Sequence, residues 1–305
     1  MSAKPGPALP VTPAAAATTG VIVVLLAASS LAPLTTFARL AYDSGATPTA
    51  VLLARYACAS LALLVLLLVL RRPLLPPRWA TANVLGAAFS WFIASNCYLA
   101  AVNFIPVSLA ALIFYTFPLM VAVLARFTEG ARIGRLGQLA FLAAFAGLAL
   151  ALGPSFQGLD WRGIVFALAG AAGSAGALLF TGRLGTRIDG FGLTFWTNAF
   201  SLPGMIVLIL LTGSWALPSL PEGWLPFAGG AVCYVVAINL MFLGTRLAGA
   251  AKSSMILNLE PVITIGVAAA LLGERLTPLQ FVGAALVVAA VALTSFKRRR
   301  KLVEG

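Results

Sequence analysis

The chain has 305 residues, of which 61% are hydrophobic and only 9% are charged, and its mean hydropathy is +1.02. A soluble domain carries roughly 25% charged residues, so this composition excludes a fully water-exposed surface and requires most of the surface to face lipid. The chain contains no His, which excludes His-based catalysis and His metal sites. Its three Cys lie apart in apolar runs and match no zinc or disulfide pattern.

Apolar segments long enough to cross a membrane recur along nearly the whole chain. A bilayer core about 30 Å thick needs roughly 20 apolar residues in a helix, and short connections join the segments without an inserted soluble domain. We therefore predict an all-α integral membrane protein with ten transmembrane helices. Between a disordered tail at 1–19 and a basic tail at 297–305, the helices are predicted at 20–41, 48–70, 79–102, 107–127, 134–152, 161–184, 191–211, 224–247, 249–272 and 278–296.

The Lys and Arg residues predict the orientation of the chain. Sixteen of the 20 fall on one side of this topology, whereas Arg39, Arg162 and Arg275 fall on the other side. The positive-inside rule then places both termini in the cytoplasm, and the composition favours a bacterial inner membrane. The net charge is +12, and we expect the basic run at 297–301 to contact anionic lipid rather than nucleic acid.

The second half of the chain repeats the first at an offset of 143 residues without a gap. Each copy has five helices, an odd number, so the second copy (161–296) must enter the membrane from the opposite face to the first (20–152). Inverted repeats of this kind place a substrate site between the copies and permit alternating access. The matched pairs include Trp91 with Tyr234, Asn96 with Asn239, Pro118 with Pro261 and Arg132 with Arg275.

The second repeat contains the segment ILNLEPVITIGVAAALLGERLTPLQFVG, in which Glu260 and Pro261 precede a Gly-Glu-Arg triplet. In a chain of ten helices and two repeats, this segment resembles the drug/metabolite transporter superfamily, specifically its EamA-type members. The first repeat keeps the proline in FYTFPLMVAVLARFTEGAR but has Phe117 in place of the acid. The resemblance covers residues 20–296 and implies a ten-helix transporter. The aromatic-rich third and fourth helices are similar to bacterial exporters of aromatic and other amphipathic amino acids.

Polar residues and prolines inside a bilayer are costly and therefore point to function. Glu260 lies near the middle of the ninth helix. It is interpreted either as a carboxylate that binds a proton or a substrate amine, or as a structural acid that caps backbone groups freed by Pro261. Pro118 and Pro261 are expected to break their helices near mid-depth and to act as kinks or gates. Pro33 and Pro203 give the same signal more weakly.

Aromatic residues are candidates for a cavity lining. Trp91, Ser95 and Tyr98 are spaced to share one face of the third helix. Tyr234 matches Trp91 in the second repeat, and Tyr115 lies one turn before the proline of the fourth helix. Aromatic faces at this depth suit an amphipathic substrate; the alternative is packing or contact with lipid.

Amides and hydroxyls form a second group of candidates. Ser254 and Asn258 share a face of the ninth helix, and Asn258 lies one turn from the proline there. We expect Asn258 beside the cavity, in contact with the polar end of a substrate. Asn96 and Asn239 match across the repeats and are expected to form hydrogen bonds between helices.

Two further features have a structural and a functional interpretation. Arg55 lies inside the second helix. It is interpreted as pairing with Asp43, as extending to the membrane–water interface, or as binding a substrate carboxylate. Gly170, Gly173 and Gly176 form a small-residue face on the sixth helix, which favours close helix packing.

Together these patterns predict a secondary transporter that exports small amphipathic metabolites, most of all aromatic and other amino acids, by alternating access. The alternative is a proton-coupled exporter of drugs, organic cations or other metabolites. No enzyme is expected because no nucleophile lies beside a base, and no ATP-driven pump because no phosphate-binding loop is present. We expect no cofactor or metal, a small-molecule substrate and the lipid bilayer as partners, and a monomer, because the internal two-fold supplies both halves.

Overall fold

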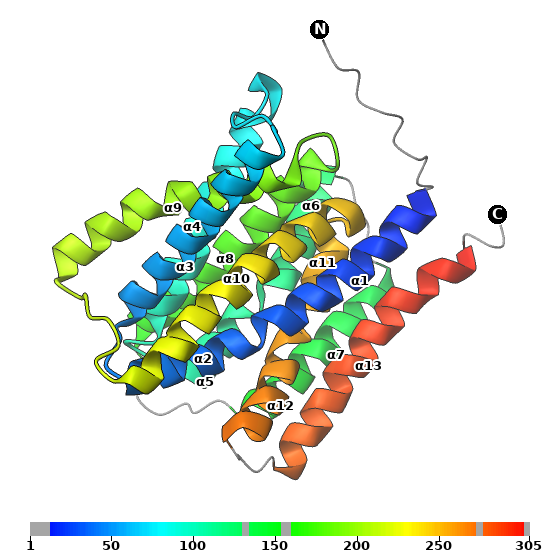
Figure 1. Ribbon diagram of the computed structural model, residues 1–305. Helices are drawn as coiled ribbons and strands as arrows, with labels where there is room; N and C mark the ends of the chain where they lie inside the picture. Colours follow the sequence, from blue (N-terminus) through cyan, green and yellow to red (C-terminus); the bar gives the residue numbers. More distant parts are fainter. Residues whose placement is uncertain (1–12, 130–133, 154–159, 273–276, 302–305) are drawn as a thin grey trace, which may run out of the picture.

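The computed structural model describes residues 13–129, 134–153, 160–272 and 277–301, which form 13 helices and, within those ranges, no strand (Figure 1). The first five helices are α1 (Pro13–Leu31), α2 (Pro33–Asp43), α3 (Pro48–Val69), α4 (Arg78–Ala101) and α5 (Val107–Phe114). They are followed by α6 (Phe117–Glu129), α7 (Arg135–Leu152), α8 (Trp161–Leu184) and α9 (Gly190–Thr212). The last four are α10 (Pro221–Ala248), α11 (Ala250–Leu257), α12 (Glu260–Leu272) and α13 (Pro278–Lys301).

The 13 helices make ten membrane spans, because three spans consist of two shorter helices each. Proline explains these interruptions: it is the first residue of α2 and the second residue of α6 and of α12. It lacks the N–H that would continue the preceding helix, and its ring clashes with the previous turn. The breaks predicted at Pro118 and Pro261 are therefore present, and so is the weaker one at Pro33. Pro203 differs, because α9 continues through it.

Two helices are longer than the sequence indicated. α1 begins at Pro13 rather than Gly20, because a proline followed by alanines is a favourable start for a helix. α13 continues to Lys301 rather than ending at Phe296, since basic residues stabilise the negative end of the helix dipole. The rest of the two predicted tails, 1–12 and 302–305, lies outside the described residues, as does the Gly-Glu-Arg triplet at 273–275.

The two repeats interlock rather than lying side by side. The most extensive helix packing joins α4 to α8 and α1 to α10, two contacts that the repeat symmetry exchanges. α3 packs on its own repeat equivalent α9, and α7 on its equivalent α13 (Figure 1). The pseudo-two-fold axis therefore passes between α3 and α9 and again between α7 and α13. The inverted five-helix repeats share one core.

Glycines permit the close approach of the helices. A side chain at Gly173 of α8 would lie 2.6 Å from the backbone nitrogen of Ala94 in α4. One at Gly283 of α13 would lie 2.5 Å from the backbone of Gly147 in α7. The small-residue face predicted on the sixth span is thus a packing surface, as small residues commonly are between membrane helices.

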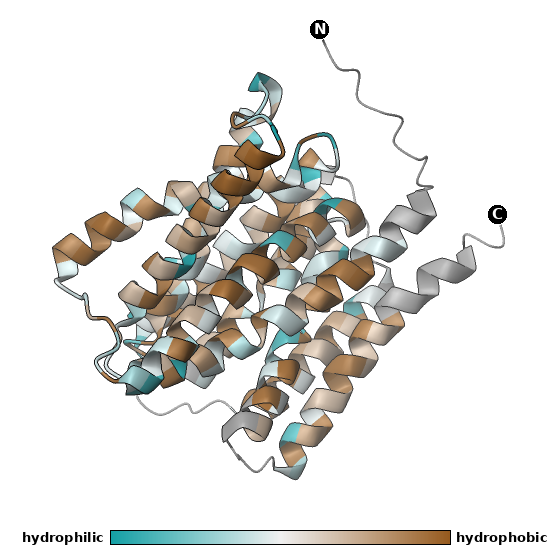
Figure 2. Ribbon diagram, viewed as in Figure 1, coloured by the Kyte–Doolittle hydropathy of each residue, from teal (hydrophilic) through white to brown (hydrophobic). Residues whose placement is uncertain are grey.

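Large apolar side chains remain on the outside of the bundle, and hydrophobic residues recur along the length of most helices (Figure 2). Phe127, Leu211 and Leu225 are each about four-fifths exposed. Such exposure is unfavourable in water and favourable in hydrocarbon, which agrees with the membrane assignment.

Candidate functional site

Two helix breaks, one from each repeat, form the framework of the site. In the first repeat Tyr115 and Thr116 separate α5 from α6; in the second, Asn258 and Leu259 separate α11 from α12. Both breaks contain the same tight turn: Thr116 N–H donates to the Ile113 carbonyl at 3.0 Å, and Leu259 N–H donates to the equivalent Ile256 carbonyl at 3.0 Å. Because α11 packs against α6, the two breaks lie near each other.

An acid and a phenol from opposite repeats meet between the breaks. The Tyr115 hydroxyl faces the carboxylate of Glu260. Tyr98 of α4 lies near the same carboxylate. Its ring packs on Phe114 with centroids 4.8 Å apart, and Phe114 packs on Tyr115 at 5.6 Å. The carboxylate is therefore bordered by aromatic rings.

Asn258 adds an unused hydrogen-bond acceptor to this group. Its side chain is only 4% exposed, and its Oδ1 has no hydrogen-bond partner. A buried amide oxygen without a partner costs roughly 1–3 kcal/mol. Such a cost is commonly tolerated where a ligand supplies the missing donor.

A cavity of about 410 Å³ opens between α6 and α7 and reaches both breaks. Tyr115, Thr116 and Asn258 line it where the helices are broken, and Arg126 and Gln138 line it near the α6–α7 connection. The walls in between are apolar side chains of α6 and α7. This volume is in the range of small-molecule pockets, about 300–1,000 Å³.

A second polar group lies nearer the pseudo-two-fold axis. Trp91 Nε1–H donates to the Tyr234 hydroxyl at 3.0 Å, and this hydroxyl donates to Asn198 Oδ1 at 2.8 Å. The ring of Tyr56 packs edge-on against Tyr234 with centroids 6.0 Å apart. The Tyr56 hydroxyl faces Ser95 but forms no hydrogen bond of good geometry. The two aromatic repeat partners therefore contact each other directly.

Several predicted polar contacts are made within a single helix instead. Asn96 donates to the Phe92 carbonyl at 2.9 Å, and Asn239 to the Val235 carbonyl at 2.8 Å. The expectation of bonds between helices was thus wrong, because the preceding turn offers a nearer acceptor. Ser254 likewise donates to a carbonyl of its own helix, so its hydroxyl is already satisfied.

Loops join the repeats on the side opposite to the start of α1 and the end of α13. Ser219 N–H donates to the Ser44 carbonyl at 2.8 Å, and Thr47 N–H donates to the Ala216 carbonyl at 3.0 Å. Gly45 permits the turn, with φ of 95°, and a side chain there would meet Ser219. We call this junction, residues 44–49 with 214–219, the loop latch.

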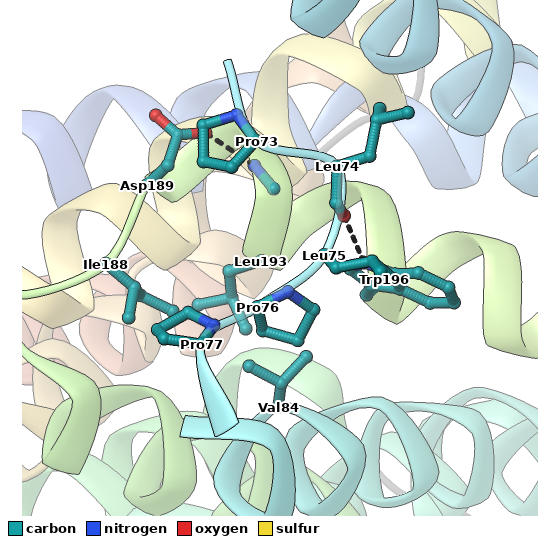
Figure 3. Close-up of a pocket in the computed structure, with 11 residues that line it drawn as sticks. Pro73, Leu74, Leu75, Pro76, Pro77, Val84, Ile188, Asp189, Leu193 and Trp196 are labelled. Atoms are coloured by element: carbon teal, nitrogen blue, oxygen red, sulfur yellow. Dashed lines mark hydrogen bonds between the residues drawn. The ribbon is translucent and has the colours of Figure 1, made fainter. Parts of the chain in front are cut away.

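The symmetry-related junction on the other side is built differently (Figure 3). The prolines of residues 73–77 pack against the start of α9, and Trp196 Nε1–H donates to the Leu74 carbonyl at 2.7 Å. Asp189 caps α9 by accepting from Gly192 N–H at 2.8 Å. The cavity enclosed there is about 30 Å³, which suits one water rather than an organic ligand.

The structure thus divides the predicted site residues into three sets. Tyr98, Tyr115, Asn258 and Glu260 gather at the helix breaks, together with Pro118 and Pro261. Trp91, Ser95 and Tyr234 belong to the group near the axis, and Ser254 joins neither. Sequence reasoning missed Phe114, Tyr56 and Asn198, although Asn198 could have been found as a polar residue within a span, at the position that matches Arg55.

These features define a membrane transporter of small molecules, built from two inverted repeats around an internal polar site. The chain belongs to the EamA-like transporter family, which matches it twice, at residues 18–153 and 161–296. It is 29% identical over 261 residues to "Uncharacterized transporter YcbK" of Bacillus subtilis (strain 168), covering 80% of this chain and 82% of that protein. A solved crystal structure of another protein resembles it with a TM-score of 0.78 at 16% identity, over 90% of this chain and 96% of that one, a likeness of fold alone.

Proposed function

We propose that the protein exports amphipathic amino acids, aromatic ones foremost, by alternating access from the cytoplasm across a bacterial inner membrane. One observation carries the proposal: Glu260 and Asn258 of one repeat meet Tyr115 of the other at the two helix breaks, beside a cavity of about 410 Å³. The site offers acceptors at one place and apolar surface around it. An amphipathic amino acid has the complementary form.

The chemistry assigns the two ends of the substrate. The carboxylate of Glu260 and the unpaired Oδ1 of Asn258 are both acceptors, so they bind a donor, the substrate ammonium group. The rings of Tyr98 and Phe114 pack on its side chain and attract its positive charge. Trp91 and Tyr234 hold the repeats together behind this site.

The breaks also provide the movement. Pro118 and Pro261 stand at equivalent positions of the two repeats, so the half-helices α6 and α12 move about equivalent turns. With both termini in the cytoplasm, the loop latch lies on the outer side, and its backbone hydrogen bonds favour a resting state closed to the outside. Release of the substrate requires the latch to open, a rearrangement typical of inverted-repeat transporters.

An organic cation is the second candidate substrate, because a carboxylate bordered by aromatic rings also suits a quaternary ammonium group. Counterflow into liposomes separates the two. Liposomes that contain the purified protein are loaded with unlabelled tryptophan, phenylalanine, threonine or a quaternary ammonium, and entry of the labelled trace is followed without an ion gradient. We expect accumulation with the aromatic amino acids; accumulation with the cation alone would reject the amino-acid proposal.

Two variants test the position of the site. Tyr115→Ala removes a phenol that touches Glu260, and Trp91→Ala removes the donor to Tyr234. Both should impair counterflow, the first through substrate affinity and the second through the packing of the repeats. Unchanged kinetics in both variants would place the substrate elsewhere.

A further inference from the structure

We infer that Arg55 binds the carboxylate of the transported molecule, so that the substrate is a zwitterion held between Arg55 of one repeat and Glu260 of the other. This inference rests on the proposed function and narrows it, because it assigns the second charged end of the substrate. It also distinguishes amino acids from organic cations.

Arg55 of α3 is a half-buried charged side chain that lies against α2 and α10. Its Nη2 donates to the carbonyl of Leu34 at 2.9 Å, whereas its Nε has neither a hydrogen-bond partner nor contact with solvent. Gly230 of α10 lies beside the guanidinium, because a Cβ there would be in ordinary van der Waals contact with Nη2, at 3.8 Å. Arg55 thus faces the interior with a donor unused.

Within the described part of the chain, no carboxylate pairs with this guanidinium. Among the residues that the structure describes, Arg55 forms no ion pair, and the predicted partner Asp43 does not bind it. The ionisable side chains near the guanidinium are Tyr42, Tyr56, Tyr234 and Cys233. Tyrosine and cysteine are ordinarily uncharged at neutral pH. Enclosing a charge is costly unless a counter-ion accompanies it, so the site is suited to an anionic ligand.

The break between α1 and α2 brings this guanidinium towards the Glu260 site. The carbonyl of Leu34 accepts from Arg55, and the carbonyl of Ala32, two residues earlier, accepts from Thr264 Oγ1 at 3.2 Å. Thr264 lies four residues after Glu260 on α12, and therefore on the same face of that helix. Arg55 thus lies beside this break, and Glu260 lies one helical turn from the residue of α12 that contacts it.

Tyrosines lie near both charged residues. Tyr42 lies near both Arg55 and Tyr98, and Tyr98 lies near Glu260. The guanidinium and the carboxylate do not pair with each other, yet both face this set of phenols. A molecule with an anionic and a cationic end satisfies both residues at once.

The repeat pattern supports a specific role rather than a structural requirement. The residue equivalent to Arg55 is Asn198, which accepts a hydrogen bond from Tyr234, and the residue equivalent to Glu260 is Phe117. The fold therefore accommodates neutral residues at both positions. Because the two charges come from different repeats, a bound zwitterion connects the repeats, whereas an amine or an acid alone contacts only one.

Ligand analogues that lack one charge test this inference. Binding of tryptophan, tryptamine (no carboxylate) and indole-3-propionate (no amine) is measured by ligand-induced thermal stabilisation of the purified full chain. We expect wild type to prefer tryptophan to both analogues. Arg55→Asn, which installs the residue of the other repeat, should weaken tryptophan about 10- to 100-fold and leave tryptamine unchanged, as expected for the loss of a charge-assisted contact.

Further variants guard against a simple folding defect. Arg55→Lys keeps the positive charge and should retain part of the preference for tryptophan. The matched control is Arg162→Gln, which should change none of the three affinities. Arg162 is an exposed arginine that pairs with Asp160 at 2.7 Å. Glu260→Gln should weaken tryptophan and tryptamine but spare indole-3-propionate.

The outcomes distinguish the two proposals. If wild type carries tryptophan in counterflow but Arg55→Asn weakens tryptophan and tryptamine equally, the role of Arg55 is rejected and the proposed function stands. If wild type binds tryptamine as tightly as tryptophan and carries it as fast, the zwitterion requirement is rejected. If wild type neither binds nor carries any of these molecules, both proposals fail.

Discussion

The α5–α6 break and the α11–α12 break are repeat equivalents with the same architecture. Each joins a helix of 8 residues to a helix of 13 residues, with the same tight turn between them. Their side chains differ. Phe117, which starts α6, is 4% exposed and packs on Tyr115 at 6.0 Å, whereas Glu260 starts α12 and faces the Tyr115 hydroxyl.

This difference shows how an inverted repeat acquires one asymmetric site. Proline and the tight turn fix the backbone in both copies, so the side chains at the turn can diverge without altering the fold. The first repeat supplies aromatic surface and the second supplies acceptors. A substrate with two unlike ends requires such a division, which two identical breaks would not provide.

The largest expected effect comes from removing the charge that distinguishes the breaks. Glu260→Gln keeps the shape of the side chain but loses the anion, which costs about 1.5–3 kcal/mol of interaction with an ammonium group. The KM for tryptophan in counterflow should rise about 10- to 100-fold. Phe117→Leu, at the equivalent position, is the control and should change KM little; equal effects of the two variants would contradict the asymmetry.

The prolines test whether the shared backbone is used as a hinge. Pro118→Ala and Pro261→Ala each restore an N–H that can extend the preceding helix across the break. Stiffening of either break should lower the turnover rate with little change in KM. A rise of about 1.4 kcal/mol in the barrier to the conformational change lowers the rate about tenfold. Pro203→Ala, in the uninterrupted α9, serves as the control. An unchanged turnover rate in both variants would remove the hinge role.

A smaller effect is expected at the unpaired amide. Asn258→Leu removes a buried acceptor that has no partner, so the free energy of unfolding should increase by about 1 kcal/mol. Substrate affinity should fall at the same time, because a ligand acceptor is lost. Thermal unfolding and ligand titration of the same sample measure both effects. Reduced stability together with unchanged affinity would show that Asn258 serves the fold alone.

The smallest effect is expected where the repeats are alike. Asn96→Ala and Asn239→Ala each remove a side chain bonded to its own helix. Each should change the free energy of unfolding by about 0.6 kcal/mol or less and leave counterflow unchanged. A strong transport defect in only one of the two would reveal a second asymmetric position.

Helix spans and breaks could be predicted from the sequence because their causes are local. About 20 apolar residues are needed for each span, and Pro118 and Pro261 interrupt a helix whatever surrounds them. The ends of α1 and α13 were placed less well, since alanines and basic residues extend a helix beyond its apolar stretch. The effect of Pro203 on its helix was overestimated, because a proline within a membrane helix can be tolerated when neighbouring groups satisfy the freed carbonyl.

The partners of individual side chains required the tertiary structure. The spacing of Trp91, Ser95 and Tyr98 placed them on one face of a helix, but it could not show that Trp91 binds Tyr234 while Tyr98 faces Glu260. Asn96 could bond to its own helix or to a neighbour, and only the packed bundle decides between them.

By itself the sequence determined the lipid-facing composition, the ten spans and the inverted repeat, because hydrophobicity and helix length act on each segment separately. Only the tertiary structure decided that α1 packs on α10 and α4 on α8. The same packing brings Tyr115 to Glu260 and leaves Arg55 without a counter-ion among the residues that the structure describes. Contacts between segments far apart in the chain depend on the joint packing of all ten spans, and no local pattern contains that information.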